Sequence, residues 1–63
     1  RMIHPLASIH PDARAGEDVI VGAGAQLGPS ARIRRCVVWD GARVDGRHDG
    51  CVISRRHVVQ VQG

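Results

Sequence analysis

The stretch Val21-Gly22-Ala23-Gly24-Ala25-Gln26-Leu27-Gly28-Pro29-Ser30-Ala31-Arg32-Ile33 carries the pattern that decides the fold. Aliphatic residues recur in it every six positions, at Val21, Leu27 and Ile33. A helix needs apolar residues at a period of 3.6 and a half-buried strand at a period of two, so neither element alone explains this spacing. The period of six predicts short strands joined by sharp corners, three to a coil, wound into a parallel β-helix.

The same period extends in both directions from this stretch. A second column of small or β-branched residues follows four positions after each aliphatic residue, at Ala7, Ala13, Val19, Ala25, Ala31 and Val37. We expect both columns to point into the core. Three hexads per coil stack the aliphatic residues at the spacing of paired strands, about 4.8 Å, with Ile3 under Val21, Ile9 under Leu27 and Ala15 under Ile33.

The pattern becomes irregular in the second half of the chain. The third coil begins at Val38, after a side that is one residue short. The side that contains Asp45–Gly50 is about two residues shorter than the regular repeat, so we expect it to round its corner without a full third strand. A fourth coil is predicted to begin at Ile53 and to stop at Val61, with residues 60–63 frayed.

Through about Val44, the hexads resemble those of the hexapeptide-repeat, left-handed β-helix family. Within them, residues 31–44 (ARIRRCVVWDGARV) are similar to the C-terminal β-helix of bacterial sugar-1-phosphate nucleotidyltransferases, particularly the mannose-1-phosphate guanylyltransferase type. Residues 3–11 (IHPLASIHP) are similar to the way such a β-helix begins after the catalytic domain. The resemblance implies an all-β, single-stranded left-handed parallel β-helix of about three and a half coils. On this interpretation residues 1–63 form one left-handed β-helix domain, a C-terminal fragment of a larger protein.

The resemblance also implies a function for the chain. Sugar nucleotidyltransferases carry their phosphate-binding glycine loop and metal-binding aspartates in an N-terminal Rossmann-like domain, and these 63 residues contain no equivalent. The chain is therefore expected to be a structural and oligomerisation domain that is not catalytic by itself. No cofactor is expected in it, and Mg²⁺ is expected in the catalytic domain of the parent, a cytoplasmic enzyme. Two alternatives stay open: a fragment of a hexapeptide-repeat acyltransferase, and a stand-alone oligomerisation module.

Chain length favours a fragment or an oligomer. Ordering a chain costs about 1.5 kcal/mol per residue, against about 25 cal/mol gained for each Å² of buried apolar surface, so 63 residues balance near zero. The first and last coils of a repeat protein also expose apolar cross-sections unless they are capped. We expect the partner to be further copies, in a dimer or trimer, the missing catalytic domain, or both.

Composition argues against two other classes of partner. All nine basic residues are arginine and the net charge is +3, but no aromatic residues lie between them to stack on bases, so we predict no nucleic-acid binding. The sequence contains no run of about 18 apolar residues, so we predict no membrane span.

The two cysteines are predicted to stack on each other. Cys36 and Cys51 each lie two residues before an inward aliphatic residue, Val38 or Ile53, and so occupy equivalent positions on successive coils. That proximity is compatible with a disulfide. A cytosolic compartment favours reduced thiols that act as small core fillers.

Four histidines are the candidates for chemistry. His4 and His10 follow inward residues and precede prolines, which indicates corners. His48 and His57 fall four residues after an inward aliphatic residue, in the position that alanine holds earlier. They are the weak alternative for a catalytic base or a metal ligand, because hexapeptide acyltransferases use a histidine base and β-helical carbonic anhydrases bind zinc through histidines. No pair has the spacing of the anhydrase ligands, so we assign no catalytic, cofactor-binding or metal residue.

Trp39 is the residue that packing explains least. It follows Val38 at the corner position held by His4 and Gly22 in the preceding coils, so it should point outward. Tryptophan is enriched among the residues that dominate binding energy in interfaces. The candidate interface is therefore Trp39 with Asp40 and Arg43, facing either the missing catalytic domain or a second β-helix.

Overall fold

The chain forms a parallel β-helix in a computed structural model that describes residues 1–61. No described residue lies in an α-helix. The strands are β1 (Met2–Ile3), β2 (Ser8–Ile9), β3 (Arg14–Ala15), β4 (Ile20–Val21), β5 (Gln26–Leu27), β6 (Arg32–Arg34), β7 (Val37–Val38), β8 (Arg43–Val44), β9 (Arg47–Asp49), β10 (Cys51–Ile53) and β11 (Val58–Gln60).

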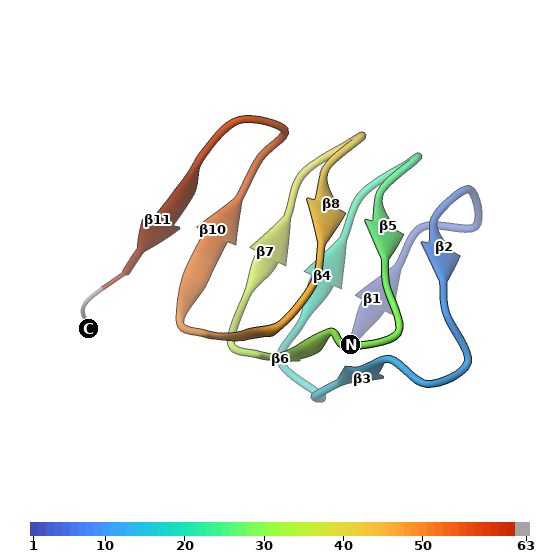
Figure 1. Ribbon diagram of the computed structural model, residues 1–63. Coiled ribbons are helices and arrows are strands. Elements are labelled where there is room, and N and C mark those ends of the chain that lie inside the picture. The colour runs from blue at the N-terminus through green and yellow to red at the C-terminus, as the bar shows by residue number, and fades with distance from the viewer. Residues whose placement is uncertain (62–63) are drawn as a thin grey trace.

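Three sheets make the three sides of a prism, around which the chain winds in left-handed coils (Figure 1). Face A has the strand order β1-β4-β7-β10-β11, face B the order β2-β5-β8 and face C the order β3-β6-β9. Because neighbouring strands in each face are one coil apart in sequence, they pair in parallel, except for β10 with β11.

The predicted stacking of the hexads is confirmed by the strand register. Ile3 pairs with Val21, Ile9 with Leu27 and Ala15 with Ile33. The third coil begins at Val38, which pairs with Val21 as expected. The six-residue period therefore specified which residues lie one above another through the first two coils and into the third.

The core is a column of aliphatic and small side chains inside the prism. Its buried members are Ala13, Val19, Val21, Ala25, Leu27, Ala31, Ile33, Cys36, Val38, Ala42, Val44, Cys51 and Ile53. The assignment of Val37 to the inward column was wrong. Because that side is one residue short, Cys36 fills the inward position and Val37 pairs with Ile20 on the outer surface.

The expectation that Asp45–Gly50 lacks a full third strand was also wrong. Residues 47–49 form β9, which pairs with β6 and places His48 beside Ile33. This side of the coil is shorter than the regular repeat because its corners, not its strand, contain fewer residues. Gly46 and Gly50 adopt φ angles of 79° and 71° there, in the left-handed region that glycine enters without a steric penalty.

The chain after Ile53 turns back on itself instead of starting a fourth coil, which corrects the prediction for residues 53–61. β11 runs antiparallel to β10, with Val52 opposite Val59. Ser54 closes the turn, because its backbone N–H donates to the carbonyl of His57 at 2.8 Å and its Oγ accepts from the N–H of His57 at 3.2 Å.

The expected fraying was wrong for residues 60 and 61. Gln60 belongs to β11, and the N–H of Val61 donates to the carbonyl of Gly50 at 2.7 Å. Gln62 and Gly63 lie outside the described residues.

The hairpin covers the C-terminal end of the prism. Val58 lies opposite Ile53 and Gln60 opposite Cys51, on the side of the strand that faces the core. The side-chain amide of Gln60 also donates to the carbonyl of Asp49 at 2.7 Å. The last coil therefore does not leave its apolar cross-section open, as an uncapped repeat would.

Gly22 is expected to resist substitution because the next coil lies directly above it. A Cβ built at Gly22 would lie 2.8 Å from the backbone nitrogen of Asp40, closer than real Cβ contacts. Gly22→Ala should lower the free energy of unfolding by about 1–3 kcal/mol, the usual cost of overpacking. Gly16→Ala is the matched control, since the nearest atom there is the flexible carboxylate of Asp18 at 3.2 Å. Equal thermal melts for the two variants would contradict this close approach of the coils.

Candidate interaction surface

The outward positions of face A form a continuous apolar row. Residues in register on successive strands of this face are Met2, Ile20, Val37, Val52 and Val59, which we call the apolar row. Met2 is 70% exposed, Ile20 48% and Val59 55%, while Val37 and Val52 are half-buried. A row of five apolar side chains along one outer side of a small domain indicates a contact surface.

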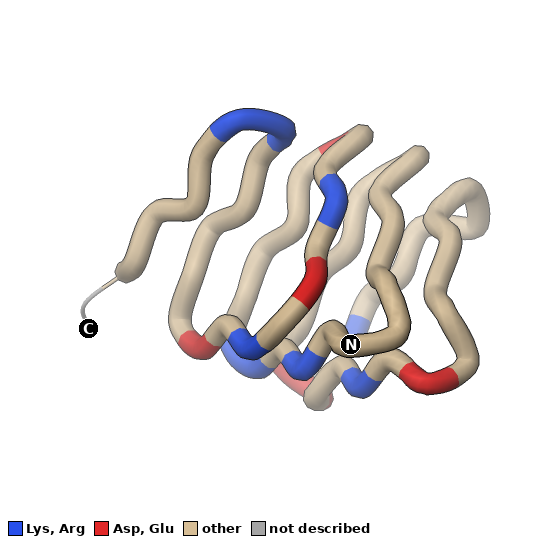
Figure 2. Tube along the Cα trace, viewed as in Figure 1, with Lys and Arg blue, Asp and Glu red and all other residues tan. Residues whose placement is uncertain are grey.

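The equivalent outward positions on the other two faces are polar. Face B presents Ser8, Gln26 and Arg43 in register, and the Nε of Arg43 donates to the side-chain oxygen of Gln26 at 3.1 Å. Face C presents Arg14, Arg32 and Arg47, which we call the arginine row. Figure 2 shows basic segments following one another from coil to coil on this face, with acidic segments at the corners beside them. The apolar row is a property of face A rather than of the repeat.

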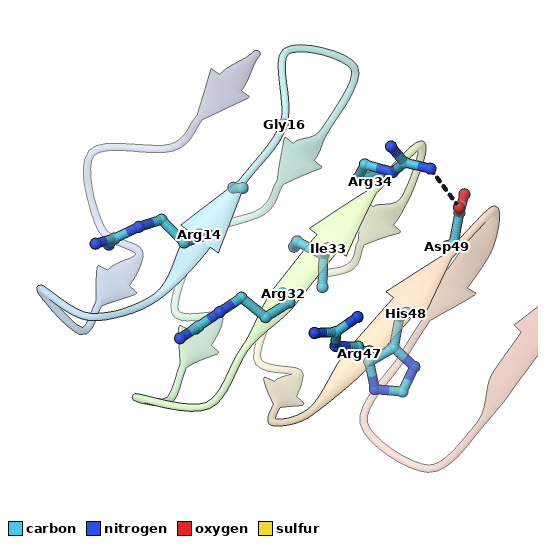
Figure 3. Close-up of a pocket in the computed structure, with 9 residues that line it drawn as sticks. Arg14, Gly16, Arg32, Ile33, Arg34, Arg47, His48 and Asp49 are labelled. Carbon is cyan, nitrogen blue, oxygen red and sulfur yellow. Dashed lines mark hydrogen bonds and ion pairs between the residues drawn. The ribbon is translucent and has the colours of Figure 1, made fainter.

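Backbone carbonyls at the corners accept hydrogen bonds from two members of the arginine row. Figure 3 shows the three side chains of this row on neighbouring strands. Arg14 Nη1 donates to the carbonyls of Ala13 and Pro11, at 3.0 and 3.1 Å. Arg32 Nη1 donates to the carbonyls of Ala31, Asp12 and Pro29, at 2.8, 3.0 and 3.2 Å. None of the three arginines forms an ion pair with a carboxylate of residues 1–61. Face C therefore keeps its positive charge.

A neighbouring cluster on the same side of the molecule is partly neutralised by one carboxylate. Asp49 accepts hydrogen bonds from Arg34 Nη2 at 3.0 Å and from Arg35 Nε at 2.7 Å. These two hydrogen bonds hold the pKa of the Asp49 carboxyl below its ordinary value, and the one from Arg34 has the larger effect. The same carboxylate raises the pKa of Arg35. The cluster links β6, β9 and the corner after β6, and this pairing leaves it less able to attract an external ligand.

Trp39 points outward, as the sequence predicted, and lies beside the apolar row. Its side chain is 59% exposed. The backbone N–H of Trp39 donates to the carbonyl of Ile53 in the next coil, just as the N–H of Gly22 donates to the carbonyl of Val38, so the two residues occupy equivalent corner positions. A shallow groove along this edge is lined by Ile20, Val37 and Trp39, and also by the charged residues Arg55 and Arg56 of the hairpin turn. The indole thus extends the apolar surface of face A to its corner.

The three predicted interface residues do not share one surface. Asp40 lines the groove with Trp39, and its Oδ1 accepts the N–H of Ala23 at 2.9 Å, which ties two coils together. Arg43 lies on face B and lines a different hollow, together with Ser8 and Gln26. Trp39 and Asp40 therefore belong together, and Arg43 belongs to the polar face.

The histidines occupy structural positions. The Nδ1 of His4 accepts the N–H of Leu6, and the Nδ1 of His10 accepts that of Asp12, both at 3.0 Å, so both close corners as predicted. His48 and His57 are not in the alanine positions. His48 takes the place of the larger inward residue, opposite Ile33, with its Nε2 3.0 Å from the carbonyl of Asp45. His57 lies in the exposed turn of the hairpin.

Nothing brings His48 and His57 together as a site. Among residues 1–61, no group of three or more histidine, cysteine or acidic side chains is placed to hold a metal ion.

The two cysteines stack as predicted and are free thiols in the core. Burial raises the pKa of the Cys36 thiol above its ordinary value. The Sγ atom donates to the carbonyls of Arg34 at 3.0 Å and His48 at 3.4 Å. This environment favours the protonated, unreactive form, consistent with a packing role.

Sequence reasoning missed the apolar row, although a signal for it was present. In every third hexad the inward aliphatic residue is preceded by a second apolar residue, giving the doublets Met2-Ile3, Ile20-Val21, Val37-Val38 and Val52-Ile53. The corresponding residues on face B are serine, glutamine and arginine. Three hexads make one coil, so a feature that recurs every third hexad marks a single face.

The fold and these surfaces define a parallel β-helix of hexapeptide repeats with one apolar and two polar faces. No protein-family model matches the chain, and no solved structure matches it significantly. The chain is similar to the carnitine operon protein CaiE of Escherichia coli (strain K12 / DH10B) and of Escherichia fergusonii, at 43% identity over 56 residues. The match covers 82% of this chain and 27% of each relative. The chain thus spans about a quarter of the length of the curated relatives it matches. No described helix is long and apolar enough to cross a membrane.

Proposed function

We propose that this chain is a non-catalytic β-helical assembly module. The observation that carries the proposal is the apolar row, because the repeat requires apolar residues inside the prism and not outside it. Apolar side chains on an outer face lower the solubility of a free domain and stabilise it only when something covers them. The groove beside Trp39 adds a residue type that is favoured at the centre of interfaces.

For the protein that such a module serves, we propose a sugar-1-phosphate nucleotidyltransferase. The support is the resemblance of residues 31–44 and 3–11 to the C-terminal β-helix of that class. In this proposal the phosphate-binding loop and the Mg²⁺ ligands belong to a catalytic domain, and the β-helix gives the assembly a rigid frame.

The similarity to the carnitine operon proteins favours a second candidate. This candidate comprises the two alternatives considered above, a fragment of a hexapeptide-repeat acyltransferase and a stand-alone oligomerisation module. In either protein the apolar face would serve assembly. The two candidates differ in what precedes the first coil. A glycine-rich nucleotidyltransferase loop upstream supports the first candidate, and further hexads upstream support the second.

The purified chain is expected to show no nucleotidyl transfer and to bind no zinc at stoichiometric level. The assay offers a sugar 1-phosphate, a nucleoside triphosphate and Mg²⁺, and follows pyrophosphate release. Elemental analysis measures zinc, and His48→Ala and His57→Ala serve as matched variants that should leave both measurements unchanged. One zinc per chain or per trimer, lost in either variant, would overturn the non-catalytic assignment, and so would transfer above the no-protein rate.

A further inference from the structure

We infer that face A is covered by face A of a second copy of this chain, packed about a two-fold axis with the two apolar rows at the centre. This inference rests on the assembly function proposed above and names its partner. A two-fold interface uses the same patch on both copies, so the patch must be complementary to itself. A row without any charged residue meets that condition, because no pair of like charges is brought together when it meets its own copy.

Electrostatics rule out the corresponding arrangement for the other faces. Packing face C on its copy would oppose two sets of Arg14, Arg32 and Arg47, none of which has a carboxylate partner within residues 1–61. Like charges that oppose one another across an interface cost free energy. Packing face B on its copy would bury Gln26 and Arg43. Face A is the side of the prism whose row of outward strand residues contains no charge, and its charged neighbours, Asp40, Arg55 and Arg56, lie at its rim, where they can stay in water.

The size of the face fits a weak dimer. The molecule measures 28 by 20 by 18 Å, so one side of the prism offers about 500 Å², and two sides together bury about 1,000 Å². That area lies near the lower limit of specific interfaces, for which dissociation constants on the order of micromolar are ordinary. Two sheets packed face to face lie about 10 Å apart with their strands crossing at about 30°.

The arrangement places a particular residue near the axis. Val37 is the middle member of the apolar row, with Met2 and Ile20 on one side and Val52 and Val59 on the other. A two-fold axis through the centre of the row therefore brings Val37 of each copy close to Val37 of the other. Trp39, two residues further along the chain, lies at the rim of the same face.

Cysteine cross-linking tests this geometry in the full 63-residue chain. Val37→Cys should form a covalent dimer with a short bismaleimide cross-linker whose reach matches the separation of about 10 Å between packed sheets, a separation too large for a direct disulfide. Its yield should be at least about tenfold above that of Gln26→Cys, the matched outward position on face B. The native thiols of Cys36 and Cys51 are buried, at 1% and 4% exposure, and should not cross-link. Equal yields from the two variants would overturn the proposed interface.

Light scattering and sedimentation equilibrium from about 1 μM to about 1 mM provide the second measurement. The wild-type chain should change from monomer to dimer over this range. The double variant Ile20→Lys with Val37→Lys should stay monomeric, while Gln26→Lys should dimerise like the wild type. Both substituted residues point outward, so circular dichroism should show an intact fold.

A wild-type chain that remains monomeric at about 1 mM would overturn the dimer and leave face A to another domain of a longer polypeptide. A dimer that persists in the folded double-lysine variant would also overturn it. Neither result bears on the non-catalytic assignment, which depends on the transfer and zinc measurements alone.

Discussion

Replacing Leu27 with Asp is expected to unfold the domain. Leu27 is 2% exposed and lies between Ile9 below and Val44 above, in the middle of the prism. The described core contains no buried polar or charged side chain that could pair with a carboxylate there. Burying an unpaired charge costs several kcal/mol. The total stability of a natural domain is only about 5–15 kcal/mol and is small for a chain of this size.

Gln26→Asp is the matched control for this prediction. Gln26 precedes Leu27 on β5, but its side chain points outward and is exposed. The charge is the same and the strand is the same, so the comparison isolates the direction of the side chain. Thermal melts followed by circular dichroism should show a cooperative transition for Gln26→Asp and none for Leu27→Asp. Equal effects would contradict the register of the coils.

Replacing Val59 with Pro is expected to remove the C-terminal cap. The backbone hydrogen bonds from Ser54 to His57 and from Val61 to Gly50 mark the hydrogen-bonded pairs of the hairpin. Hydrogen-bonded and non-hydrogen-bonded pairs alternate along an antiparallel ladder, so Val52 and Val59 form the hydrogen-bonded pair that lies between these two. The N–H of Val59 is therefore directed at β10. Proline has no N–H, so the hydrogen bond is lost and the carbonyl of Val52 is left without its partner. Together these effects should lower the free energy of unfolding by about 3 kcal/mol. The melting temperature should fall by more than about 10 °C.

The neighbouring substitution Val58→Pro is the matched control. By the same alternation the N–H of Val58 points to the free edge of the sheet, where proline is tolerated. Its expected cost is about 1 kcal/mol, from altered packing against Ile53. If Val58→Pro is as destabilising as Val59→Pro in the same melts, the hairpin pairing described here is wrong.

The sequence was sufficient for the regular part of the fold. Where inward positions are marked by aliphatic residues at a fixed interval, as from Ile3 to Ile33, each residue could be assigned to its strand, its face and its neighbours in the coils. The interval works because one side of every strand is buried, which fixes the register.

The prediction of the coil path failed where the inward position is not held by an aliphatic residue. His48 holds an inward position on β9 that no hydrophobic pattern would identify, and glycine corners at Gly46 and Gly50 allow shorter sides than the repeat suggests. The hairpin turn lacks the Asn-Gly or Asp-Gly pair that signals such turns, since Ser54 closes it through its side chain. Both failures arise from backbone geometry that residue spacing alone does not encode.

The position of one residue of the candidate interface was predicted correctly. Trp39 could be placed on the outside from its corner position, and the structure confirms that exposure. Arg43 was grouped with it because the two are close in sequence, but the corner between them turns the chain onto another face. Neighbours along a β-helix diverge at each corner, whereas residues about one coil apart become neighbours. Residues that share an outer surface are therefore found by comparing positions one coil apart, not positions within the same hexad or in adjacent hexads.

The reversed direction of β11 has a consequence for how this molecule can grow. Filaments of stacked β-helices form when the last coil of one molecule templates a parallel strand from the next, in the manner of cross-β fibrils. In this chain the growing edge of β10 is already occupied by a strand of opposite polarity. On face A an incoming coil would meet β11 in place of β10, so it could pair there only with a strand that runs against the direction of the stack. The hairpin thus interrupts the parallel stack on one of the three faces and hinders head-to-tail addition of a further coil at this end.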